Sequence, residues 1–230
     1  MRIFLGIIIG LVLAIGIAFG AAKYAFGDLS NVGERDKSRD VTQTLELAGF
    51  DRIDIGGVFE VDVTVGGEFS VVVTGAEDAM ARLDAVVEDG VLKLDQDEIS
   101  FGKRPWRNQG MSAVISLPAL NGFDLAGVAD GEVSGIDSEA FEVNLAGVGD
   151  LTLEGSCGRL DARVSGVGEL DAEGLQCRDV EVDVSGVGQA SVYASETADA
   201  SVGGIGSIDI YGSPSRVEKN TSFISSISVK

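Results

Sequence analysis

The strongest constraint on the fold of this chain is a short segment that recurs five times in its second half. Each copy has an aliphatic residue, a small residue, glycine, then valine or isoleucine, and a small residue again. The central glycines are Gly127, Gly147, Gly166, Gly186 and Gly204, so successive copies are 20, 19, 20 and 18 residues apart. A repeat of this length is typical of stacked architectures, in which each repeat contacts its neighbours.

The residues that follow each glycine keep the same register and predict β-strands. An apolar column lies beside a polar column, which is the period-two alternation of a strand with one buried face. The apolar column contains Val133, Leu153, Ala172, Val192 and Ile210, and the polar column contains Glu132, Thr152, Asp171, Ser191 and Asp209. We therefore predict an all-β fold, a right-handed parallel β-solenoid (β-helix) with coils of about 20 residues.

The glycines mark the corners of the predicted coils. A chain that turns sharply within a thin coil needs a positive φ or a close approach between backbones, and a Cβ atom is costly in both cases. A second corner is expected near Gly135, Gly155, Gly174 and Gly212. We expect the residue between the glycines of the first corner to point inward, which gives a core ladder of Val128, Val148, Val167, Val187 and Ile205.

Residues 41–122 have the patterns of further strands of the same body. Apolar and polar residues alternate in segments 50–55, 59–65, 69–73 and 111–117. Within this region Ile55-Gly56-Gly57-Val58 resembles the repeated corner. Residues 86–94 predict a β-hairpin that turns at Asp89-Gly90, and residues 77–83 predict one or two turns of helix.

The composition excludes several classes of function. The formal net charge of −20 makes nucleic acids and anionic lipid headgroups poor partners, because their phosphates are bound by clustered Lys and Arg. The chain has no histidine, so no mechanism can use a histidine as general base, metal ligand or orienting group. We find no catalytic constellation and expect no cofactor and no metal.

The N-terminus predicts export. Residues 3–22 carry no charge and follow Arg2 and the α-amino group, and a helix of this length can span a bilayer. An uncleaved membrane anchor and a cleaved signal peptide are both open. The expected organisation is a signal anchor or signal peptide, a polar linker and a solenoid domain, at residues 1–26, 27–40 and 41–230. The domain is expected outside the cytoplasm, anchored in the inner membrane and facing the periplasm, or secreted to the cell surface.

Several segments together carry a family resemblance. They are the run from Phe50, the strand Gly56-Gly57-Val58-Phe59-Glu60-Val61, the hairpin Asp89-Gly90-Val91-Leu92, the segment Leu117-Pro118-Ala119-Leu120 and the repeated Ser-Gly-Val-Gly corners. Over about residues 44–227 the chain resembles the putative auto-transporter adhesin head GIN domain family. The resemblance implies a β-solenoid domain on exported bacterial proteins with an adhesive role, and it brings no catalytic residues.

A candidate binding site lies in the irregular stretch 97–110. It contains Lys103, Arg104, Trp106 and Arg107, and Trp106 is the single tryptophan of the chain. An aromatic plane flanked by guanidinium groups can stack on a sugar ring and pair with a carboxylate or sulfate. The alternative is a cross-over loop in which Trp106 covers exposed core and the cations are solvated.

One polar column places three carboxylates on adjacent coils. Asp130, Asp150 and Glu169 should lie about 4.8 Å apart, and calcium could relieve their mutual repulsion. The spacing differs from that of the calcium-binding Gly-Gly-x-Gly-x-Asp repeat, and the column changes to Gln189 and Ser207 on the later coils. We therefore expect a solvated acidic face.

The two cysteines of the chain predict a disulfide. Cys157 and Cys177 each lie eight residues before the serine of the next corner, so the repeat places them in one column of adjacent coils. The rung spacing of about 4.8 Å falls within the usual Cα separation of a bridge, and export supplies an oxidising compartment. The alternative is a pair of buried free thiols.

These features favour a non-catalytic extracytoplasmic envelope protein, an adhesin or a module that binds a glycan or another surface ligand. A purely structural envelope protein is the alternative. A polysaccharide-active enzyme is third, because parallel β-helices also host such enzymes, but no insertion between these coils is long enough to wall a groove.

Overall fold

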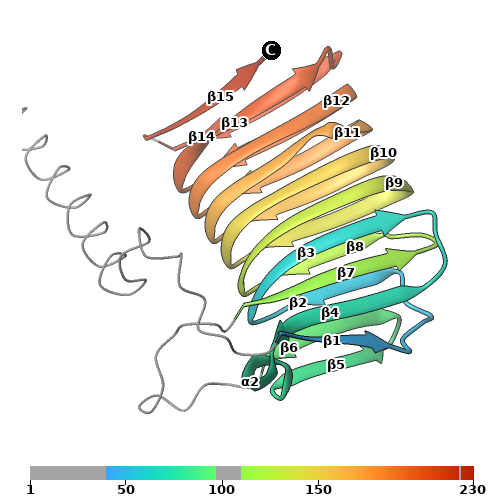
Figure 1. Ribbon diagram of the computed structural model, residues 1–230. Helices are drawn as coiled ribbons and strands as arrows, with labels where there is room; N and C mark the ends of the chain where they lie inside the picture. Colours follow the sequence, from blue (N-terminus) through green and yellow to red (C-terminus); the bar gives the residue numbers. More distant parts are fainter. Residues whose placement is uncertain (1–39, 97–109, 223) are drawn as a thin grey trace, which may run out of the picture. The chain divides into compact units, whose positions relative to one another are not determined.

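The computed structural model describes residues 40–96, 110–222 and 224–230, and nearly all of them belong to one 15-stranded sheet (Figure 1). The strands are β1 Asp40–Leu45, β2 Arg52–Ile55, β3 Val58–Val65, β4 Ser70–Ala76, β5 Leu83–Glu88, β6 Val91–Gln96, β7 Met111–Leu117, β8 Gly122–Leu125, β9 Val128–Leu145, β10 Val148–Val164, β11 Val167–Val184, β12 Val187–Val202, β13 Ile205–Gly212, β14 Arg216–Thr221 and β15 Ser225–Val229. The single helix within this part of the chain is α2, Glu77–Met80.

The five repeats form a stack of parallel coils, which confirms the predicted β-solenoid. Strands β9, β10, β11, β12 and β13 pair in that order, each in parallel with the next (Figure 1). The register joins equivalent residues, so Leu151 lies beside Leu170 and Ala162 beside Val182. Three inward ladders are at most 1% exposed: Leu125, Leu145, Val164, Val184 and Val202; Leu151, Leu170, Ala190 and Ile208; and Val133, Leu153, Ala172, Val192 and Ile210.

The glycines of the first corner allow close contact between successive coils. A Cβ atom on Gly147 would lie 1.9 Å from the carbonyl oxygen of Gly127, and one on Gly166 would lie 1.8 Å from that of Gly147. The same carbonyls accept the backbone N–H of Val148 at 2.9 Å and of Val167 at 3.0 Å. Neither Gly147 nor Gly166 has a positive φ, so these two positions exclude a side chain because the backbones approach closely.

The expected inward ladder at this corner is wrong. Val128, Val148, Val167, Val187 and Ile205 are 44–54% exposed. The reason is that the alternation continues without interruption through the corner: Leu145 and Leu151 both point inward, and Val148 is three residues from each. An odd separation places a strand residue on the opposite face. The valines therefore project into solvent.

The N-terminal part continues the stack and then adds antiparallel strands. Strand β3 lies parallel between β7 and β9, and β2 lies parallel between β6 and β8. Strand β4 pairs antiparallel with both β1 and β7, and β5 pairs antiparallel with β6. The sequence predicted only the last of these pairings, as a hairpin. The hairpin turns at Asp89 and Gly90, whose φ angles are 50° and 80°. Helix α2 confirms the helical turn predicted for residues 77–83.

The second corner is less regular than the first. Strands β9 to β12 run through it without a break, and the pairing of β10 with β11 shifts between Thr152 and Gly155. The pairing of β11 with β12 shifts twice, between Ala172 and Gln176 and again after Cys177. These irregularities absorb the unequal lengths of the coils.

Residues 1–39 and 97–109 lie outside the described residues, and with them the predicted export segment 3–22 and most of the polar linker. Among the residues that the structure does describe, no helix is long and apolar enough to cross a membrane.

Candidate functional site

A row of exposed aliphatic side chains follows the first corner from coil to coil. Six of the ten exposed large hydrophobic residues of the described chain belong to it, and the half-buried Val58 begins it. The row is called the valine ridge: Val58, Val128, Val148, Val167, Val187, Ile205 and Ile224. Val58 pairs with Val128 although 70 residues separate them, because the corner at Gly57 stacks on that at Gly127. Ile224 precedes Ser225, the partner of Gly206, and is 70% exposed.

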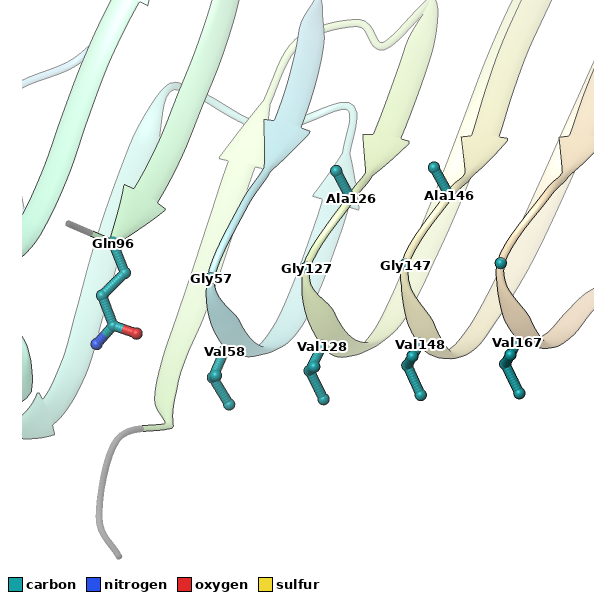
Figure 2. A pocket seen from close by; sticks show the side chains of 11 residues that line it. Gly57, Val58, Gln96, Ala126, Gly127, Val128, Ala146, Gly147, Val148 and Val167 are labelled. Atoms are coloured by element: carbon teal, nitrogen blue, oxygen red, sulfur yellow. The ribbon is translucent and has the colours of Figure 1, made fainter. Parts of the chain in front are cut away.

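A furrow runs beside the valine ridge. Figure 2 shows Ala126 and Ala146 on one side of the line of corner glycines and the ridge valines on the other. Gly57, Gly127, Gly147 and Gly166 form the floor, where only backbone is present, and the groove they share with the first four ridge residues has a volume of about 580 Å³. Gln96 lies at its N-terminal end (Figure 2). The groove is shallow, linear and walled by aliphatic side chains.

An acidic flank borders the ridge on the side away from the furrow. It is defined by Glu60, Asp62, Asp130, Glu132, Asp150, Glu169 and Asp171, which lie on the outer faces of β3, β9, β10 and β11. The Asp130 and Asp150 carboxylates each accept one backbone N–H, from Asp150 at 3.2 Å and from Glu169 at 3.0 Å. Both residues are exposed.

The ion pairs of the described residues involve other carboxylates, one of which, Asp209, lies in the column of Glu132 and Asp171 on a later coil. Arg52 contacts Glu142 at 2.8 Å and Asp124 at 3.9 Å, and Arg163 contacts Glu142 at 3.4 Å. Arg159 pairs with Glu181, and Lys230 lies 3.5 Å from Asp209. No Lys or Arg of the described chain lies within 4.0 Å of an acidic-flank carboxylate, so seven carboxylates over four coils have no cationic partner in this part of the protein.

Three carboxyl groups near Arg52 have shifted pKa values. A hydrogen bond from Arg52 holds the pKa of Glu142 below its usual value. Asp54 and Asp124 are neighbours on β2 and β8, and partial burial raises the pKa of both against the opposing effects of Lys93 and Arg52. These carboxyl groups interact with neighbouring side chains of the sheet, and we assign them a structural role.

The carboxylate column that suggested calcium shows a different arrangement. Within residues 40–96 and 110–230, apart from residue 223, no group of three or more acidic or cysteine side chains is placed to hold a metal ion. Asp130 and Asp150 instead bond to the backbone of the following coil.

The binding residues suggested by the sequence fall outside the described part of the chain. Lys103, Arg104, Trp106 and Arg107 lie within 97–109, so their role stays a prediction. The cysteines are described: Cys157 on β10 and Cys177 on β11 are directly paired in the register and joined by a disulfide, with Cα atoms 4.5 Å apart.

The valine ridge is a surface that the sequence analysis missed. The signal was present, because counting in steps of two from Leu151 or Leu170 puts Val148 and Val167 on the outer face. The apolar character of the valines favoured the inward interpretation.

Comparison with known proteins identifies the family. Residues 49–214 match the family described as putative auto-transporter adhesin, head GIN domain. The chain belongs to this family. Among solved structures, it is similar to a putative adhesin from Bacteroides fragilis, with 24% identity, a TM-score of 0.70 and coverage of 86% of this chain and 100% of that one. A putative adhesin from Parabacteroides distasonis has 15% identity and a TM-score of 0.50, over 84% and 98% of the two chains. No curated protein matches the sequence.

These likenesses show that the two solved structures share the fold of this chain. The matched region begins just before Phe50 and ends just after Gly212. It therefore contains the ridge from Val58 to Ile205, together with the whole acidic flank.

Proposed function

We propose that this GIN-domain protein is a non-catalytic extracytoplasmic envelope protein that binds surfaces in the manner of an adhesin. The observation that carries the proposal is the valine ridge. Soluble domains seldom expose contiguous apolar rows, and such rows mark interaction sites. Repetition on successive coils gives the ridge the linear, multipoint character of an adhesive surface, and membership of an adhesin family supports the same function.

The location rests on two features. The Cys157–Cys177 disulfide is a bond that persists in oxidising compartments outside the cytoplasm. The apolar residues 3–22 supply an export signal, with the solenoid on the outer side of the membrane.

An adhesion assay tests the proposal. The full-length chain, kept in solution with a neutral detergent, is coupled to beads that are presented to bacterial cells and to a glycan array. We expect adhesion that falls at least about tenfold in Val148→Lys, because a charge interrupts the apolar row. The control is Val41→Lys, which changes an exposed valine on β1 outside the ridge. Adhesion unchanged by Val148→Lys, or absent altogether, would leave the structural envelope protein as the better account.

The cluster of Lys103, Arg104, Trp106 and Arg107 is the second candidate contact, for a glycan with acidic groups. Trp106→Ala should lower glycan binding while changing the melting temperature little. A large loss of melting temperature with an unchanged binding profile would instead assign Trp106 to packing.

A further inference from the structure

We infer that the partner of the valine ridge is a cationic amphipathic α-helix that lies along the solenoid axis, with its apolar stripe on the ridge and its Lys or Arg residues over the acidic flank. The inference rests on the proposed binding function and names the class of partner.

The spacing of the ridge favours a helix over an extended strand. Successive coils of a parallel stack are about 4.8 Å apart, and one helical turn advances about 5.4 Å. Side chains on one face of a strand repeat every 6.4–6.8 Å, which loses register with the ridge within two coils. Over the four coils from Val58 to Val167, a helix accumulates a mismatch of only about 2 Å, which flexible side chains accommodate.

The surface shape of the corner is also complementary to a helix. A groove, the furrow at Gly127, Gly147 and Gly166, runs along one side of the ridge. Side chains of a helix form ridges that pack into such grooves. The furrow has a volume of about 580 Å³, and the wall opposite the ridge consists of the small side chains of Ala126 and Ala146, so side chains of a helix can enter it.

The charge of the neighbouring surface indicates that the docked helix is cationic. The acidic flank begins two residues beyond the ridge valine, about 6.6 Å along the strand. A Lys or Arg on the flank of a docked helix has the length to reach that column while its methylene groups cover the valines. Seven carboxylates without cations in the described chain favour a basic flank and disfavour an acidic one.

The same charges disfavour other occupants. A second copy in antiparallel contact across the ridge would bring acidic flank toward acidic flank, and the chain carries a net charge of −20. An anionic lipid surface would be repelled as well.

The test uses a synthetic 18-residue peptide of leucine, lysine and alanine, with leucines along one helical face and lysines along one flank. Binding to the full-length protein in neutral detergent is measured by fluorescence anisotropy. We expect saturable binding that weakens as salt is raised. A peptide with glutamate in place of lysine, and one interrupted by a central proline, should each bind at least about tenfold more weakly.

Two pairs of variants locate the contact. Val148→Lys with Val167→Lys should weaken binding at least about tenfold, and Val41→Lys should not. Asp150→Asn with Glu169→Gln should weaken it about threefold or more and reduce its salt dependence, while Glu154→Gln with Glu173→Gln, on the same two strands, should not. Asparagine keeps the oxygen that accepts the Glu169 N–H, and melting temperatures check that every variant is folded.

Equal binding of the lysine and glutamate peptides, or binding that survives the ridge variants, overturns the inference. So does a ridge-dependent glycan signal or a ridge-dependent dimer in place of peptide binding. If the lysine peptide fails while Val148→Lys still abolishes bead adhesion, the class of partner is wrong and the proposed function stands.

Discussion

The inner ladder and the valine ridge are made of the same kind of residue and lie three positions apart on the same strands. Leu151, Leu170 and Ile208 are at most 1% exposed, whereas Val148, Val167 and Ile205 are about half exposed. Both rows stack in register through the whole repeat. Position in the alternation, and not side-chain hydrophobicity, therefore decides which row builds the core and which is available for binding.

The strongest test of this difference between the two rows is to place a carboxylate in each of them and compare the loss of stability. Leu170→Asp should lower the free energy of unfolding by about 4 kcal/mol or more, because it removes a buried side chain and leaves an unpaired charge in an apolar stack. Against a total of roughly 5–15 kcal/mol this approaches global unfolding. Val167→Asp should cost within about 0.5 kcal/mol, since the site is exposed. The free energy of unfolding of both variants is measured by denaturant titration. Equal losses of stability would show that the valines support the core.

The disulfide tests whether the interior can be weakened without altering the ridge. Cys157→Ser with Cys177→Ser should cost about 3 kcal/mol, because the bond closes a loop between residues 20 apart in the chain. Ridge-dependent binding should persist in the folded fraction. The bond itself is checked by alkylation and mass spectrometry of protein made in the periplasm, where labelling of two thiols before reduction would contradict it.

The corner between the two rows can be tested at single glycines. Gly166→Ala should cost about 1–3 kcal/mol, because the new Cβ would meet the Gly147 carbonyl oxygen at 1.8 Å and backbone cannot move aside as a side chain can. Gly203→Ala is the matched control on the same corner, where a Cβ meets nothing within 4 Å and the other coils carry alanine or serine. Similar melting temperatures for the two variants would rule out the carbonyl contact.

The smallest expected effect concerns a partly buried acid on the opposite side of the furrow. Burial raises the pKa of Asp124 in the folded state. The stability linked to its protonated form is therefore present below the unfolded pKa and lost as the pH rises through the folded value. Asp124→Asn should raise the melting temperature at pH 7 by about 1–2 °C, with the difference vanishing below about pH 4. A variant that is less stable at pH 7 would mean that the contact with Arg52 outweighs burial.

Much of the solenoid could be predicted from the sequence because the repeat itself fixes the register. The columns of Val133 and of Glu132, the corner at Gly57 and the pairing of Cys157 with Cys177 all follow from aligning the copies. The direction of the valines could not be taken from composition, since valine is apolar on either face. The antiparallel placement of β1 and β4 was also beyond reach, because alternation within a strand does not encode the direction of its neighbour.

Trp106 lies outside the described residues, and its candidate site is a prediction from residue types. The ridge, in contrast, depends on contacts between segments as distant as Val58 and Val128. The motif resemblance at Gly57 suggested this stacking, and the parallel register of β3 and β9 establishes it.

The two corners also set different limits on how the length of this protein can vary in evolution. At the glycine corner each coil rests on the carbonyl of the one before, so an inserted residue would shift every later contact. At the second corner the register already slips between β10 and β11, and again between β11 and β12. Insertions and deletions of one or two residues should therefore accumulate at the second corner, and the glycine corner should change only by the gain or loss of an entire coil.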